Sequence, residues 1–138
     1  MRYLPWAILA LLAYSLVAPL MKVATREIPS DVAAFYANLM LVGAALGVIL
    51  VSGQSVTTYA THDLAPAMYA AGACLAVGIL AYYRALALGP VSVVAPVFGT
   101  FLVVSSLVGI AVLNESLSLR KVLGIALAAV AVWLTAGE

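Results

Sequence analysis

The sequence predicts an all-α transmembrane protein, a five-helix bundle whose termini lie on opposite sides of the membrane. Two features of the composition indicate this fold class, since 67% of the 138 residues are hydrophobic and only 8% are charged. Soluble domains are about half apolar and about 25% charged, and so small a chain cannot hide this much apolar surface from water. The third feature is the continuity of the apolar residues, which form runs long enough to cross a hydrocarbon core of about 30 Å.

Five apolar runs follow one another along the chain. The expected spans are residues 3–22, 32–51, 64–88, 91–113 and 119–136. Because these runs are continuous rather than alternating, they predict helices and not the strands of a membrane barrel. The first run also resembles a secretory signal, but it is longer than the apolar core of such a signal, so a membrane span is the preferred interpretation. Together the spans are expected to form one domain over residues 1–138.

The fifth run is the shortest. It reaches full length only if its helix begins near Leu119 and the stems of Arg120 and Lys121 extend back to the lipid headgroups. Short polar segments separate the runs, at residues 26–31, 52–63, 89–90 and 114–121. In the first segment, Ser30 or Asp31 is expected to cap the second helix.

Positively charged residues are divided evenly between the two membrane faces. Five spans place Arg2, Arg120 and Lys121 on the N-terminal face and Lys22, Arg26 and Arg84 on the other. The positive-inside rule therefore chooses no orientation. Three explanations remain open: the chain inserts both ways and pairs with an inverted copy, it pairs with an inverted paralogous partner, or hydrophobicity sets a single orientation and the balance is chance.

An antiparallel homodimer is the first of these explanations, and it allows a contact that one chain forbids. Arg84 and Glu115 lie on opposite faces within a chain, but Arg84 of one copy shares a face with Glu115 of an inverted copy. Transporters are often built from two such inverted halves. The sequence therefore suggests the hypothesis that Arg84 of one copy forms an ion pair with Glu115 of the other.

Several functional classes are excluded by what the chain lacks. The net charge is +1, with no basic stripe, so nucleic acid is not an expected partner. The single cysteine, Cys74, excludes a disulfide scaffold. No metal-binding, nucleotide-binding or catalytic constellation is visible, so an enzyme is not expected, nor is any cofactor.

Two motifs in the second half of the chain resemble those of the EamA-like branch of the drug/metabolite transporter superfamily. Residues 82–97 (YYRALALGPVSVVAPV) resemble the segment joining the family's third and fourth helices. Residues 113–124 (LNESLSLRKVLG) resemble its "LGE" signature, with Glu115 at the acidic position, Gly124 opening the last helix and Asn114 in place of the usual glycine. Lys22 is a weaker match, and Asn38 departs from the pattern because an arginine is frequent there.

The resemblance implies one EamA-like unit of five helices. It also implies transport of small solutes such as amino acids, nucleosides or other metabolites, mostly outward. The sequence itself narrows the solute, since the acidic residues near the spans fall in loops or at helix ends. Proton relays and cation sites usually need an acid within the span, so a neutral or zwitterionic, partly apolar solute is expected.

Four polar residues and one proline inside the spans are the candidates for binding this solute. They are Tyr14, Asn38, Tyr82, Pro96 and Thr100. Asn38 is the strongest, because its amide needs several partners and lies well inside a span. Three of the others have a structural alternative. The Thr100 hydroxyl can bond its own helix, Tyr82 fits an interfacial belt, and Pro96 is either a first-turn proline or a bend that exposes carbonyls to substrate.

Charged residues near the span ends form a second group. Lys22 and Arg84 either extend to the interface and set topology or contact an anion at the mouth of a cavity. Glu115 is expected to brace the last hairpin or a dimer contact. Small residues at Gly43 and Gly47, and again at Gly124 and Ala128, fit close helix packing but do not say which helices meet.

The sequence thus predicts a multi-pass protein of the cell (cytoplasmic or inner) membrane, in contact with lipid, that moves small metabolites by alternating access as an antiparallel dimer. Two alternatives from other classes remain. One is a subunit of a flippase for lipid-linked substrates, and the other is an assembly partner that transports nothing itself.

Overall fold

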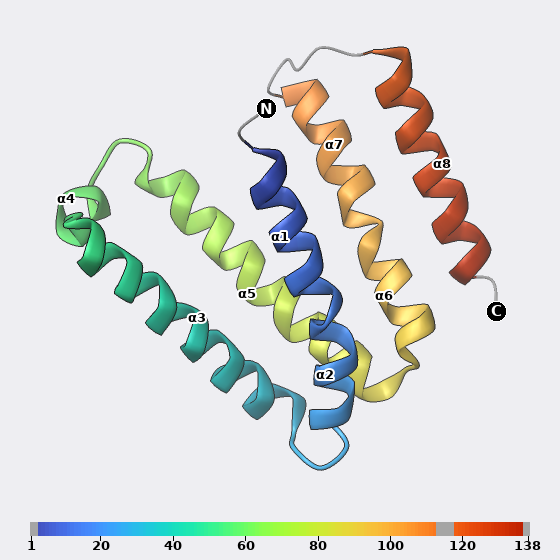
Figure 1. Cartoon of the computed structure of the whole chain (residues 1–138), viewed down its shortest axis with the longest axis horizontal. Helices are drawn as coiled ribbons and strands as arrows, with labels where there is room; N and C mark the ends of the chain where they lie inside the picture. Colours follow the sequence, from blue (N-terminus) through green and yellow to red (C-terminus); the bar gives the residue numbers. More distant parts are fainter. Residues whose placement is uncertain (1–2, 113–117, 137–138) are drawn as a thin grey trace. The chain divides into compact units, whose positions relative to one another are not determined.

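The fold is described from a computed structural model, which covers residues 3–112 and 118–136 (Figure 1). In these residues the chain is helical and contains no strand. The helices are α1 (Leu4–Ser15), α2 (Val17–Ala24), α3 (Ser30–Ser52), α4 (Val56–Ala60), α5 (Ala65–Leu88), α6 (Val91–Gly99), α7 (Phe101–Val112) and α8 (Leu119–Ala136). The predicted all-α transmembrane fold is confirmed.

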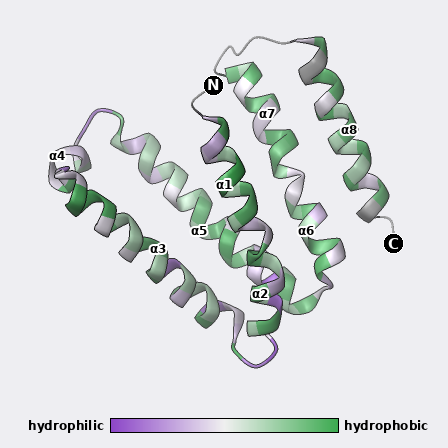
Figure 2. Ribbon diagram, in the orientation of Figure 1, coloured by the Kyte–Doolittle hydropathy of each residue, from purple (hydrophilic) through white to green (hydrophobic). Residues whose placement is uncertain are grey.

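Four helical segments are long and apolar enough to cross a membrane. They are Leu4–Ala24, Ser30–Ser52, Ala65–Leu88 and Val91–Val112, with 21 to 24 residues each. At about 1.5 Å per residue, each exceeds the hydrocarbon thickness of about 30 Å. Figure 2 shows the apolar colour along these helices and the hydrophilic colour in the turn between α2 and α3.

The helix of the fifth predicted span is α8. It begins at Leu119, where the sequence predicts it to start, and has 18 residues. Its apolar part, Val122–Leu134, is shorter than in the other four. An 18-residue helix is about 27 Å long, so it approaches the hydrocarbon thickness only when its charged first turn is included.

The first span is divided into α1 and α2 at Leu16. The backbone N–H of Leu16 donates to the carbonyl of Ala13, three residues back, at 3.3 Å. Pro19 explains the interruption, because a proline ring collides with the carbonyl four residues earlier, here that of Ser15, and has no N–H to bond it. Hydropathy alone predicts a single helix here.

The fourth span is divided into α6 and α7 at Thr100. Pro96 lies inside α6, but the interruption falls four residues beyond it, where the Thr100 hydroxyl donates to the carbonyl of Val97 at 2.6 Å. Gly99 precedes this point and is a weak helix former. The helix is therefore interrupted near the middle of the span and not at Pro96.

The start of α3 differs from the expected cap. Pro29 is the N-cap, in an extended conformation, and its carbonyl accepts hydrogen bonds from the N–H groups of Val32 and Ala33, both at 3.0 Å. Ser30 is already helical and no side chain caps the helix, so the prediction of a Ser30 or Asp31 cap is wrong. The physical reason is that the Asp31 carboxylate is engaged with another helix, as described below.

The polar stretch between the second and third spans contains the short helix α4. Ser55 is its N-cap and accepts a hydrogen bond from the N–H of Thr58 at 3.4 Å. The Tyr69 hydroxyl of α5 donates to the carbonyl of Ala60 at 2.9 Å, which ties α4 to the third span. The sequence predicts only a polar loop in this place.

The chain forms two compact units, Met1–Ala87 and Leu88–Glu138. In the first unit, most of the buried side chains belong to α2, to the start of α3 and to the end of α5. They are Ala18, Met21, Ala33, Ala34, Tyr83 and Leu86, with Leu86 fully buried. In the second unit, α8 packs against α6 and α7 (Figure 1).

Candidate functional site

A groove runs between α3 and α5 in the first unit. Its volume is about 510 Å³, within the range of small-molecule sites. It is lined by Asp31, Ala34, Phe35, Asn38, Leu39 and Val42 of α3, and by Gly72, Leu75, Ala76, Ile79 and Leu80 of α5. These positions recur every three or four residues, so each helix presents one face to the groove. We call this feature the α3–α5 groove.

Asn38 is the amide within the groove. The side chain is half-buried, and its Nδ2 donates to the carbonyl of Ala34, one turn back in the same helix, at 2.8 Å. An amide carries two donor hydrogens and an acceptor oxygen, so one such bond leaves most of its capacity unused. Its Oδ1 has no hydrogen-bond donor among the described residues. Asn38 is therefore placed to contact a molecule in the groove.

One end of the groove carries an ion pair between α3 and α5. Arg84 Nη2 lies 2.9 Å from Asp31 Oδ2, and Nε lies 3.2 Å from Oδ1, so the guanidinium binds the carboxylate through two parallel hydrogen bonds. The side chains are 64% and 54% exposed, respectively. Ion pairs with this exposure contribute about 0–1 kcal/mol to stability, so the pair is a minor element of the fold.

Lys22 lies at the same end of the first unit and has a different role. Its Nζ donates to the carbonyls of Leu86 and Ala87 at 2.8 and 3.3 Å. These carbonyls belong to the last turn of α5, where a helix carries partial negative charge and a cation is favourable. Lys22 therefore links α2 to the end of α5.

The tyrosines lie outside the lining of the α3–α5 groove. Tyr83 is buried at the junction of α2, α3 and α5, and its ring centroid is 5.9 Å from that of the half-buried Tyr82. Tyr14, near the end of α1, is 67% exposed. The structure therefore places neither Tyr14 nor Tyr82 among the residues that line the groove with Asn38.

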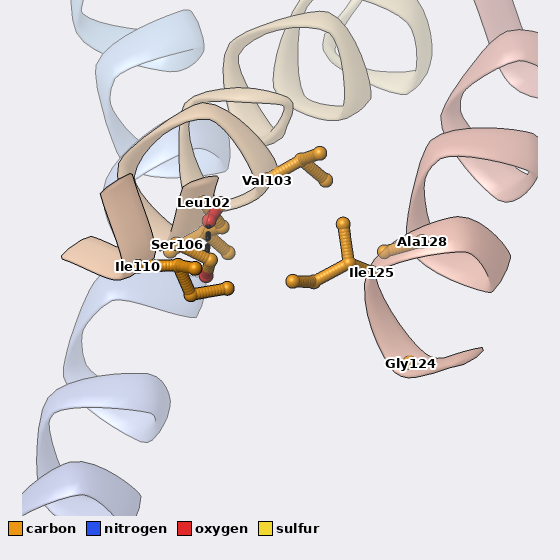
Figure 3. Close-up of a pocket in the computed structure, with 7 residues that line it drawn as sticks. All are labelled: Leu102, Val103, Ser106, Ile110, Gly124, Ile125 and Ala128. Atoms are coloured by element: carbon orange, nitrogen blue, oxygen red, sulfur yellow. Dashed lines mark hydrogen bonds between the residues drawn. The ribbon is translucent and has the colours of Figure 1, made fainter. Parts of the chain in front are cut away.

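Pro96 and Thr100 belong to the second unit, whose groove is different in character. It lies between α7 and α8, has a volume of about 380 Å³ and is lined by Leu102, Val103, Ser106, Ile110, Gly124, Ile125 and Ala128 (Figure 3). Neither Pro96 nor Thr100 is among these residues. The Ser106 hydroxyl donates to the carbonyl of Leu102 at 2.7 Å, so the polar side chain of this groove is satisfied by its own helix.

Glu115 lies outside the described residues, and so does the proposed contact between Arg84 and Glu115 of a second copy. Within the described chain, Arg84 pairs with Asp31, a partner that the sequence analysis missed. The signal was available, because the start of the second span and the end of the third lie on the same membrane face. Opposite charges at these two positions can meet in antiparallel neighbouring helices.

No metal centre is found in the part of the chain that the structure describes, where no three His, Cys, Asp or Glu side chains gather. Cys74 is exposed on α5. The described polar groups instead offer hydrogen bonds and one ion pair.

One of the comparisons with known proteins identifies a family. The model of the EamA-like transporter family matches residues 1–137. Comparison with curated proteins and with solved structures gave no match. The family match extends over all five apolar helical segments, including the α3–α5 groove. The chain is thus a membrane protein that belongs to the EamA-like transporter family.

Proposed function

We propose that this protein transports a small neutral or zwitterionic, partly apolar solute out of the cell, by alternating access. Membership of the EamA-like family suggests a transporter of some solute. The observation that carries the narrower proposal is the lining of the α3–α5 groove, where the walls are apolar, one amide is available at Asn38, and the charged residue Asp31 is neutralised by Arg84. A cation or a bare anion would find no uncompensated charge along this surface.

Proton coupling through a membrane carboxylate is disfavoured by the same lining. Among the described residues, the acids near the spans lie in turns or in the first turn of α3. An acid held at the bilayer midplane is the usual sign of a proton or cation pathway. The proposal therefore assigns substrate recognition to hydrogen bonds and apolar contact.

Flux through the purified protein tests this proposal. The full chain is reconstituted in vesicles, and uptake is measured for a panel of amino acids and nucleosides, with protein-free vesicles as the control. Saturable flux of at least one neutral or zwitterionic solute is expected. If no panel member moves above the control while the protein is folded and inserted, the transporter proposal is wrong, and a lipid-linked flippase subunit or an assembly partner becomes the better explanation.

We further propose that the transporting unit is an antiparallel dimer. The α3–α5 groove is open along its length, and a groove on one chain cannot by itself seal a solute from both sides of the membrane. A second, inverted copy supplies the opposing half, as inverted repeats do in many transporters. The even split of positive charges between the two faces supports insertion in both orientations.

Reporter fusions at the C-terminus test dual insertion. We expect both a reporter active only in the cytoplasm and one active only outside to give signal. Arg26→Gln should shift the population toward the orientation with the C-terminus outside, because positive charges then favour the N-terminal face as the cytoplasmic one. Glu27→Gln is the matched control, since acids contribute little to orientation. Signal from the same single reporter in the wild type and in both variants would contradict the homodimer.

A further inference from the structure

We propose that Asp31 and Arg84 form the recognition site for a zwitterionic solute at the end of the α3–α5 groove. In the solute-free state the two side chains bond each other. In the bound state Asp31 receives the ammonium of the solute and Arg84 receives its carboxylate. This inference rests on the proposed transport function and adds the residues that recognise the charged groups of the solute.

Charge complementarity is the first argument. The carboxylate and the guanidinium lie side by side, joined at 2.9 and 3.2 Å, so they present one negative and one positive group a few ångströms apart. An α-amino acid carries the same two charges on neighbouring groups. The guanidinium fork matches a carboxylate in geometry, and an Asp carboxylate accepts the hydrogen bonds of an ammonium.

The weakness of the pair is the second argument. Both side chains are more than half exposed, so their mutual attraction adds little to the stability of the fold. The junction of α2, α3 and α5 is held instead by buried side chains such as Leu86 and Ala34, and by Lys22 on the last carbonyls of α5. The ion pair can therefore exchange partners without loosening the helices that carry it.

The shape of the groove supplies the third argument. Asp31 and Asn38 are two turns apart on α3, which is about 10 Å along the helix. Between them the wall is formed by Ala34 and Phe35 and, across the groove, by apolar residues of α5. A solute whose charged head lies at Asp31 and Arg84 thus has an apolar surface for its side chain. Asn38 lies further along the groove, where a polar group of a longer solute can bond.

A series of three probes tests the assignment on the full chain in phosphatidylcholine vesicles. L-leucine carries both charges, its methyl ester keeps only the ammonium, and 4-methylpentanoate keeps only the carboxylate. Wild-type protein is expected to bind L-leucine about tenfold more tightly than either analogue, since each charged hydrogen-bonded contact contributes at least that factor. Equal binding of the three probes, or binding of none, would overturn the proposal.

The variants separate recognition from structure. Asp31→Asn should weaken L-leucine binding about tenfold while leaving 4-methylpentanoate bound, and Arg84→Gln should weaken L-leucine and 4-methylpentanoate but spare the methyl ester. The matched control Asp63→Asn, away from the groove, should change nothing. If a single variant fails to fold, the exchanged pair Asp31→Arg with Arg84→Asp should restore folding and L-leucine binding. Equal loss of all three probes in both single variants indicates a structural role and overturns the assignment.

Two further outcomes separate this inference from its alternatives. Wild-type flux that persists unchanged in Asp31→Asn and Arg84→Gln would reject the recognition site while the transport function stands, whereas absence of all wild-type flux would reject the function itself. Phosphatidylethanolamine carries a phosphate and a primary ammonium, whose N–H groups can donate hydrogen bonds to Asp31 as those of an amino acid do, whereas the quaternary ammonium of phosphatidylcholine has no N–H group. If adding it to the vesicles abolishes L-leucine binding, the groove is a lipid site and the proposal is wrong.

Discussion

Replacing Asn38 with Leu is expected to reduce solute flux about tenfold, without loss of the folded dimer. The amide is the polar group within the walls of the α3–α5 groove, and a lost hydrogen bond to a bound solute costs about 1–3 kcal/mol. The fold should tolerate the change, because the hydrogen bond that Asn38 makes is to Ala34 of its own helix. Initial rates of flux in vesicles, at matched protein content, measure the effect.

The matched control for this variant is Gln54→Leu. Gln54 is an exposed amide beyond the end of α3, outside the groove, so the same chemical change there should leave flux unaltered. Asn38→Gln keeps the amide and should retain part of the activity. Wild-type rates in Asn38→Leu, with the dimer intact, would remove Asn38 from the site.

The largest expected effect on stability comes from Leu86→Ala. Leu86 is fully buried where α2, α3 and α5 meet, and its truncation leaves a cavity that the surrounding helices cannot fill. Such truncations cost about 2–5 kcal/mol in soluble cores. In a membrane the apolar transfer contribution falls away and the loss of packing remains, so we expect a destabilisation of about 2 kcal/mol.

Leu88→Ala is the matched control, two residues further along the same helix. Leu88 is 90% exposed, and its truncation should change the free energy of unfolding by less than about 0.5 kcal/mol. Thermal or denaturant unfolding of the purified variants in detergent compares the two. Equal stability of Leu86→Ala and Leu88→Ala would show that the junction of α2, α3 and α5 does not carry the packing of the first unit.

Much of the fold could be predicted from the sequence, since runs of apolar residues and polar breaks locate membrane helices directly. The helices α3, α5 and α8 begin or end within two residues of the expected bounds. The interruption at Leu16 could also be predicted from the sequence, because Pro19 has to break the helical hydrogen bonds in this part of the first span. The interruption at Thr100 was not predicted, because it lies four residues beyond Pro96, and the Thr100 hydroxyl bond to Val97 does not by itself break a helix, since Ser105 makes the same bond to Leu102 inside α7.

The candidate site was predicted less completely. Asn38 lines the α3–α5 groove, although its role in binding stays a prediction. Tyr14 and Tyr82 lie elsewhere in the first unit, and Pro96 and Thr100 belong to the second. The sequence prediction pairs Arg84 with Glu115 of a second copy, whereas in the structure its partner is Asp31 on the antiparallel neighbouring helix.

Helix packing shows why the sequence alone does not predict which residues line the site. Gly43 and Gly47 have the spacing of a close helix contact, yet a Cβ at either position would meet no atom within 4 Å. Gly124 and Ala128 have the same spacing and line a groove facing α7 instead of closing it (Figure 3). Spacing alone therefore did not identify the helix faces that pack.

The sequence by itself determined that this chain lies in a membrane and where its apolar helical segments begin and end. These properties follow from the cost of placing charges and unpaired backbone groups in lipid. Only the tertiary structure decided that Leu86 and Ala34 are packed inside, that Asp31 meets Arg84, and that Asn38 faces the α3–α5 groove. The reason is physical: lipid is as apolar as a protein interior, so hydrophobicity does not distinguish the inward face of a membrane helix from the outward one.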